Sequence, residues 1–435
     1  MEEIRKIREE LSRELGEDLD VLLPTKRYEV AEDVFKKSVR RRGEKLTLTD
    51  MLDHVFLHRA LGIPIFLTLM YAVFQFAYSV SEPFMVMLEA AFGWLGSLVG
   101  ETGTPLASLW ADGICGGLGF VLVFIFPISF LFLALAVLED SGYLPRAAFV
   151  MDRLMHRLGL HGRSFIPLLL GFGCNLPAIM ATRVIDDERD RLITILVNPL
   201  MSCSARLPVY MLLAGAFFGA YAGAAVFSMY VLGIALAILM ALLFRKTIPQ
   251  LRGKPAPFIL ELPPYLRPTL RGVLLKTWQR AVVFLKKAAT ILFAGAIVLW
   301  ALASFPWGAP LEVTYAGMLG HALEPLLRPL GFDWKCAVAL LFGFLAKEIV
   351  VETFGILYGV AGEEGIATAV AAHMTPVTAF AFMAFTLIYL PCLATFGIVK
   401  TETGSWKWTL FLVAYELILA YVVAAVIIGI GSLFV

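Results

Sequence analysis

The chain has 435 residues, of which 59% are hydrophobic and only 16% are charged, and its net charge is +1. A soluble protein carries about 25% charged residues, so this composition excludes a soluble fold and predicts a polytopic membrane protein. The small net charge gives no general attraction for nucleic acid, and five cysteines, an odd number, argue against a disulfide framework.

Residues 1–58 are expected to form a charged helical stalk in the cytoplasm. Their basic cluster consists of Lys36, Lys37, Arg40, Arg41 and Arg42. This cluster is expected to lie near anionic lipid head groups, with a docking surface for another protein as the alternative. The N-terminus lacks the apolar stretch of a cleaved signal peptide.

Residues 59–114 are expected to hold a first transmembrane helix and an outer amphipathic helix. The apolar residues 61–80 would form about 30 Å of helix, which is enough to span a bilayer. Residues 81–114 contain no Lys or Arg, so the positive-inside rule places this loop outside and the N-terminus in the cytoplasm. Within the loop, residues 85–98 have the pattern of a helix that lies on the outer surface.

The first of two repeats covers residues 115–244, and a polar break interrupts its apolar stretch 165–182. Flexible glycines and a proline without an amide donor make this break, together with a thiol and a side-chain amide. These residues are Gly171, Gly173, Pro177, Cys174 and Asn175. The charges of the flanking loops agree best with a stretch that enters and leaves on the cytoplasmic side. We therefore expect a re-entrant hairpin rather than a full crossing.

The next apolar segment is interrupted over residues 198–208, which contain Pro199, Cys203 and Pro208. A proline-rich linker follows at residues 245–280 and holds eight Lys or Arg, so it is expected in the cytoplasm. The second repeat, residues 281–435, contains a similar break at Pro391, next to Cys392.

Two shifts of the chain reveal internal similarity. A shift of 172 residues aligns Gly171 with Gly343, and a shift of 189 residues aligns Cys203 with Cys392. By loop charge, the first copy begins with an inward-going helix and the second with an outward-going one, which indicates an inverted repeat. We predict an all-α polytopic membrane protein, an inverted repeat of two units with broken or re-entrant helices. In such architectures the substrate binds near the membrane midplane at the broken helices.

Three cysteines lie at these breaks: Cys174, Cys203 and Cys392. Packing as small hydrophobic side chains is the plain alternative for each of them. Together they indicate sulfur ligands, with Asn175 and freed carbonyls adding oxygens, and sulfur selects soft or borderline metals over magnesium or calcium. A thiolate also forms more easily beside a cation, whether the metal itself or Arg206.

A second cluster, Lys347, Glu348 and Glu352, interrupts the apolar residues 336–358, for which a hairpin and a full span both stay open. The two glutamates are four residues apart and share a helix face. They form either a carboxylate face that guides a cation or an internal pair with Lys347 near the membrane surface.

Several features argue against other activities. His54, His58, His156 and His161 lie in amphipathic stretches and are expected at the membrane interface rather than as ligands. The chain contains no Gly-x-x-x-x-Gly-Lys-Ser/Thr pattern, so no phosphate loop for a nucleotide is expected in it. A membrane-embedded thiol enzyme with Cys174 or Cys392 as the nucleophile is an alternative, but no histidine lies in the broken segments to act as its base.

These motifs give the chain a resemblance to the membrane region of the ferrous iron transport protein B (FeoB) family, from about residue 46 to residue 435. In chain order they are GFGCNLPAIMATR (171–183), NPLMSCSARLP (198–208), FILELPPY (258–265), AKE (346–348), PCLAT (391–395) and ETGSWKW (402–408). The resemblance implies two gate-type repeats, Fe(II) uptake across the inner or plasma membrane, and places in the iron path for Cys174, Cys203 and Cys392.

The family normally carries a cytoplasmic GTP-binding domain ahead of the membrane region, whereas only a short stalk precedes it here. Either the GTPase is a separate chain, for which residues 1–58 would be the docking site, or this sequence is a membrane-domain fragment. GTP hydrolysis is therefore not assigned to this chain.

We expect a multi-pass transporter in the cell's inner (plasma) membrane, and not an enzyme. Fe(II) would enter from outside, meet Cys and Asn ligands at the broken helices, and leave when the repeats rearrange. The expected partners are Fe(II), membrane lipid and a GTPase domain or chain, with a homo-oligomer also compatible and no nucleic acid. A sodium- or proton-coupled nucleoside carrier is the alternative within transport, because such carriers resemble this gate architecture.

Overall fold

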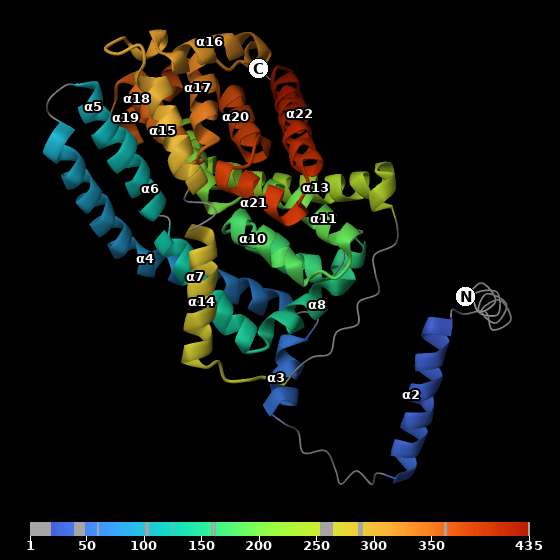
Figure 1. Cartoon of the computed structure of the whole chain (residues 1–435). Coiled ribbons are helices and arrows are strands. Elements are labelled where there is room, and N and C mark those ends of the chain that lie inside the picture. Colours follow the sequence, from blue (N-terminus) through green and yellow to red (C-terminus); the bar gives the residue numbers. More distant parts are fainter. Residues whose placement is uncertain are drawn as a thin grey trace, which may run out of the picture. The chain divides into compact units, whose positions relative to one another are not determined.

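The computed structural model describes residues 19–38, 48–58, 61–100, 104–123, 125–157, 160, 162–252, 264–285, 290–360 and 363–433. The chain divides into a small unit, Met1–Asp53, and a large unit, His54–Val435. All regular structure in the described ranges is helical (Figure 1), which confirms the predicted all-α class.

In the small unit, α2 (Leu19–Ser38) is a charged helix, as the stalk prediction required. Lys37 pairs with Asp33 one turn earlier, with 2.6 Å between the ammonium nitrogen and the carboxylate oxygen. Both side chains are exposed, so this pair contributes little to stability. The remainder of the predicted basic cluster, the side chain of Lys36 and residues Arg40, Arg41 and Arg42, lies outside the description.

The large unit carries the two repeats. α3 (Leu48–Phe56) crosses the division between the units, and α4 (Gly62–Gly100), α5 (Pro105–Ser108), a π-helical segment (Leu109–Gly116) and α6 (Gly117–Val123) follow it. The first repeat continues with α7 (Ile125–Asp140), α8 (Tyr143–Arg157), α9 (Phe165–Leu170), α10 (Asn175–Ala181), α11 (Glu188–Val197), α12 (Leu207–Phe218) and α13 (Ala222–Thr247). After the linker come α14 (Leu270–Phe284), α15 (Thr290–Ser304), α16 (Tyr315–Leu327), α17 (Trp334–Gly343), α18 (Ile349–Tyr358), α19 (Glu363–His373), α20 (Pro376–Ile388), α21 (Leu393–Thr403) and α22 (Trp406–Gly431).

Helix α4 corrects one expectation from the sequence. It runs unbroken for 39 residues, so residues 85–98 do not form a separate outer amphipathic helix but continue the first span. The proline between the two expected helices, Pro83, lies inside the helix. A proline in an apolar helix is tolerated where neighbouring helices satisfy the freed backbone groups, and α4 packs along α6 and α7.

Four helical segments of the described chain are long and apolar enough to cross a membrane, or five if α7 and α8 count as one span bent by 80°. This agrees with a polytopic membrane protein. The segment Pro376–Thr403, which contains α20 and α21, has 72% of its most apolar window buried, against 28% for the neighbouring α22. Helix α20 is therefore a central helix that contacts other protein rather than lipid, and it packs against α12, α13 and α22.

The two repeats meet along α21. In Figure 1 the orange and red helices of the second repeat lie above, α8, α10 and α11 of the first repeat lie below, and α21 crosses between them. Helix α10 contacts α21 directly. A single hydrophobic core runs through both repeats and includes Leu196 and Tyr210 of the first and Phe354 and Phe382 of the second.

Candidate functional site

The first broken stretch is a hairpin, as predicted. Helix α9 ends at Leu170, residues 171–173 turn, and α10 begins at Asn175. The two ends of the stretch come together, because Arg163 donates a hydrogen bond of 3.1 Å to the carbonyl oxygen of Val184. A stretch whose entry and exit are bonded to each other reverses its direction, which is the geometry of a re-entrant loop.

The stretch 336–358, which the sequence left open, is a second hairpin. Helix α17 ends at Gly343, and α18 begins at Ile349. At its base the ammonium group of Lys335 lies 4.2 Å from the centre of the Tyr358 ring. Its turn carries Lys347 and Glu348, so both predicted polar clusters lie at or beside a hairpin tip.

Each repeat also contains an unwound segment between two helices. In the first repeat it is residues 198–206, between α11 and α12, and in the second it is residues 389–392, between α20 and α21. Pro199 and Pro391 lie inside these segments as expected. Pro208 is the second residue of α12 and Pro177 the third of α10. Both therefore start a helix, where the missing amide donor has no intrahelical partner to lose.

Each hairpin tip is bonded to the unwound segment of its own repeat. In the first, the amide and the hydroxyl of Ser204 donate to the carbonyl oxygen of Gly173, at 3.3 and 2.8 Å. In the second, the amide of Leu393 donates to the carbonyl oxygen of Phe344 at 2.9 Å. Ser204 and Leu393 each directly follow a cysteine of the predicted site, Cys203 and Cys392. The same contact in both repeats gives the internal similarity a structural basis.

The aligned glycines support this equivalence. A Cβ atom on Gly171 would lie 2.9 Å from the Cβ of Met201, and one on Gly343 would overlap the hydroxyl of Tyr389. In both repeats a glycine at the hairpin therefore lets the unwound segment approach closely. The paired glycine and cysteine positions were visible in the sequence, although the contacts between them were not.

A cavity of about 970 Å³ is lined by α4, by the segment from Ser108 to Val123, by both hairpin tips and by both unwound segments. All six predicted ligand residues line it: Cys174, Asn175, Cys203, Glu348, Glu352 and Cys392. Lys347 and Arg206 line it too, as do Glu89 of α4 and Cys115. The sequence argument had left out Glu89 and Cys115, although Glu89 stands in a stretch without basic residues.

The polar lining residues differ in their access to solvent. Glu89 and Glu352 are exposed, Cys174, Glu348 and Cys392 are partly buried, and Asn175 and Cys203 are buried, with 5% and 8% of their surface accessible. The side-chain oxygen of Asn175 accepts no hydrogen bond from any described group. A buried amide oxygen without a donor has lost its hydration without replacement, so it favours a cation or a donor from outside the chain.

The described part of the chain has no group of three or more His, Cys, Asp or Glu side chains close enough together to hold a metal ion. The arrangement is thus a lined passage rather than a closed cage. No histidine lines it. His54, His58, His321 and His373 lie elsewhere, and the side chains of His156 and His161 are outside the described set.

The alternative role for Lys347, an internal pair with a glutamate, is not formed. Its ammonium group donates instead to the carbonyl oxygen of Leu390, at 2.6 Å. Glu348 and Glu352 start α18 and face the cavity. This leaves their carboxylates available to the cavity, as the prediction of a carboxylate face requires.

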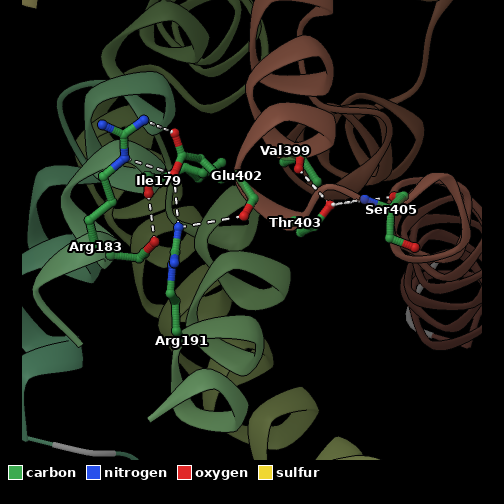
Figure 2. Close-up of polar contacts among 8 residues, drawn as sticks. Ile179, Arg183, Arg191, Val399, Glu402, Thr403 and Ser405 are labelled. Carbon is green, nitrogen blue, oxygen red and sulfur yellow. Dashed lines mark hydrogen bonds and ion pairs between the residues drawn. The ribbon is translucent and has the colours of Figure 1, made fainter. Parts of the chain in front are cut away.

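Three charged residues join the repeats beside α21. Figure 2 shows Glu402 of α21 held between Arg183, which follows α10, and Arg191 of α11. The Glu402 side chain is only 3% exposed. The hydrogen bond with Glu402 raises the pKa of Arg183 above its usual value.

Comparisons with known families match both halves of the chain. The Gate family, described as nucleoside recognition, matches residues 121–217 and 285–406. Each matched segment contains one hairpin and one unwound segment. The family of the ferrous iron transport protein B C terminus matches residues 226–280.

Three relatives match nearly the whole chain. The Fe(2+) transporter FeoB of Methanocaldococcus jannaschii is 46% identical over 437 residues, which cover 98% of this chain and 65% of the relative. The Fe(2+) transport protein A/Fe(2+) transporter FeoB fusion protein of Porphyromonas gingivalis is 41% identical, over 99% of this chain and 57% of the relative. The Fe(2+) transporter FeoB of Staphylococcus aureus strain COL is 39% identical, over 98% and 69%. The chain thus spans about three fifths to two thirds of the length of these relatives, and no solved structure matches it.

Proposed function

This chain belongs to the Fe(2+) transporter FeoB family, and from that premise we propose that it carries Fe(II) across a membrane through the cavity between its two repeats. The observation that carries the proposal is the chemistry of the cavity wall. Thiols from both repeats and an amide oxygen without a donor line one passage at two broken helices. Sulfur and oxygen donors together suit a borderline divalent metal better than magnesium or calcium.

The order of exposure supports a path rather than a storage site. The carboxylates of Glu89 and Glu352 lie at the exposed part of the wall and would attract a hydrated cation. Deeper in, Cys174, Cys392 and Cys203 would replace part of its hydration shell. A transported ion must also leave, and a few mixed contacts release a metal more readily than a four-cysteine cage.

The proposed orientation rests on loop charge. The basic linker, residues 245–280, lies on the cytoplasmic side in this assignment, as does the N-terminus. We place the protein in the inner (plasma) membrane, surrounded by lipid, with Fe(II) entering from outside.

We also propose that a GTP-binding domain or chain outside this sequence gates the passage, as the family resemblance implies. The Porphyromonas gingivalis relative is named as a fusion with Fe(2+) transport protein A, which supports the view that such transporters work with cytoplasmic partners. A docking site on residues 1–58 and assembly into a homo-oligomer belong to the same proposal.

The test is Fe(II) uptake into liposomes that hold this chain alone, under reducing and anaerobic conditions, with and without a GTPase partner and GTP. Uptake without the partner would mean that the two repeats form a complete pathway. Uptake only with the partner would mean that the chain is a gated part of a larger machine. Folded protein that carries no iron in either case would overturn the proposal.

The same liposomes separate the two alternatives. Uptake of a nucleoside driven by a sodium or proton gradient, without iron, would favour the nucleoside carrier, which the description of the Gate family keeps open. Covalent trapping of a thiol-directed substrate analogue on Cys174 or Cys392 would favour a thiol enzyme. Against that enzyme, the cavity wall offers no histidine as a base.

A further inference from the structure

Two buried cations lie at the two unwound segments, and neither has a role in the function proposed above. Arg206 is 1% exposed and Lys347 is 2% exposed. A charged side chain at membrane depth is costly, and it persists where it pairs with another charge or with backbone carbonyls.

In the first repeat, the guanidinium group of Arg206 binds two carbonyls of its own unwound segment. One nitrogen donates to the oxygen of Met201 at 2.8 Å, and another donates to the oxygen of Pro199 at 2.9 Å. These carbonyls stand where α11 has ended and α12 has not begun, so no continuous helix satisfies them.

In the second repeat, the ammonium group of Lys347 reaches the other unwound segment from the hairpin tip. It donates to the carbonyl oxygen of Leu390 at 2.6 Å and lies 3.2 Å from the centre of the Tyr389 ring. Lys347 therefore contacts the two residues that precede Pro391 and Cys392.

The bound carbonyls are equivalent in the two repeats. Met201 lies two residues before Cys203, and Leu390 lies two residues before Cys392, so the shift of 189 residues that aligns the cysteines also aligns the carbonyls. Different elements supply the cation in each repeat, yet the cation is bonded at the same backbone position. This recurrence points to a requirement of the site.

Neither cation forms a salt bridge with a carboxylate of the described chain. The buried carboxylate of Glu416 acts on both from a longer distance, and its oxygens accept no hydrogen bond from the described groups. The direct partners of the two positive charges are thus backbone carbonyls and one aromatic ring. In carriers built from inverted repeats, freed carbonyls of this kind coordinate a dissociable sodium ion or proton.

We propose that Arg206 and Lys347 are tethered cations that occupy the carbonyl sites of the two breaks and so position Cys203 and Cys392. The site then needs no dissociable sodium ion at these carbonyls. Both residues are positioning residues, since each acts on a cysteine through the backbone two residues earlier. The inference deepens the proposed function and rests on it, but its first test does not involve iron.

The test measures how fast a maleimide modifies each cysteine of the full chain in liposomes, with mass spectrometry to read the peptides separately. Lys347→Met should change the rate at Cys392 by about tenfold, the factor that corresponds to one lost hydrogen bond to a charged group. The rates at Cys203 and at Cys336, which is buried outside the cavity, should stay as in the parent protein. Lys347→Arg, which keeps the charge, should restore most of the rate.

Lys335→Met is the matched control, because it removes a lysine that also lies over a tyrosine ring but at the base of the same hairpin. It should leave the rate at Cys392 unchanged. An unchanged rate at Cys392 in Lys347→Met, or an equal change in the control, would overturn the proposal.

A second measurement needs no variant. Maleimide modification of Cys203 and Cys392 in the parent protein, and its Fe(II) uptake, should be the same in sodium and in choline buffer. A dependence of either on sodium would contradict the tethered-cation model even if Lys347→Met failed to fold. Absence of iron uptake in both buffers, with the maleimide results as expected, would instead count against the proposed transport of Fe(II).

Discussion

Glu402 and Arg183, 219 positions apart in the chain, form a two-pronged ion pair between the repeats. The Nε and Nη2 atoms of Arg183 donate to the two carboxylate oxygens of Glu402 at 2.9 and 2.5 Å (Figure 2). Arg191 donates to the same carboxylate at 2.9 Å. Bidentate pairs of this kind fix orientation as well as distance, so this contact sets how α21 meets α10 and α11.

Replacing Glu402 with Gln should loosen this junction. Since both arginines are partly exposed, we expect a loss of about 1–2 kcal/mol in the free energy of unfolding rather than the larger cost of a fully buried pair. Denaturant titration in detergent measures this loss, and passive Fe(II) leak into liposomes should rise. Glu364→Gln, the same change at an exposed position of α19, should alter neither. Equal stability of the two variants would show that the junction does not hold the repeats together.

Replacing Cys174 or Cys392 with Ser should lower Fe(II) uptake by at least about tenfold, because a hydroxyl is a poorer donor than a thiolate for a borderline metal. Expression and the melting temperature should stay near those of the parent protein. Cys336→Ser, at a cysteine outside the cavity, should leave the uptake per folded molecule unchanged. Normal uptake in both cavity variants would return these cysteines to a packing role.

Gly233→Ala should destabilise the first repeat. A Cβ atom there would lie 2.6 Å from the carbonyl oxygen of Leu200, so α13 must move away from the unwound segment. Overpacking of this kind costs about 1–3 kcal/mol, which thermal unfolding in detergent would report. Gly215→Ala on α12 meets no atom within 4 Å, so it should be neutral or slightly stabilising. A neutral Gly233→Ala would mean that the segment adapts freely.

Ser204→Ala removes the hydroxyl donor to the carbonyl oxygen of Gly173 while keeping the amide donor. One hydrogen bond contributes about 1 kcal/mol, so the fold should persist, while the first hairpin tip becomes more mobile. Hydrogen exchange at residues 171–174 should speed up relative to the second hairpin. Ser228→Ala, whose hydroxyl bonds only within α13, is the control and should leave this exchange unchanged.

The sequence predicted the elements of this site better than their contacts. Glycines and prolines within apolar runs mark places where a helix cannot continue, so both breaks and the first hairpin were predictable from Gly171, Gly173, Pro199 and Pro391. The shared cavity was an expectation that followed from the inverted repeat. The bond from Lys347 to Leu390 was not predictable, because its partner is a backbone carbonyl 43 residues away, and no side-chain pattern announces such a group.

The missed features have a similar cause. Helix α4 was divided in two because its composition changes near Pro83, whereas packing against α6 and α7 keeps it continuous. Pro177 looked like a breaker, yet its position in the first turn of α10 makes it a helix starter. In both cases the context of the residue, and not its type, decided the structure.

The length of α4 has a consequence for the lipid. Its 39 residues extend for about 58 Å at 1.5 Å per residue, roughly twice the hydrocarbon thickness of a bilayer. A helix that long must tilt steeply or protrude into the head-group layer. Its second half, with Glu89, forms part of the cavity wall, so any hydrophobic mismatch with the surrounding bilayer acts directly on the shape of the entrance. Bilayer thickness would then tune the width of that entrance without any change in the protein.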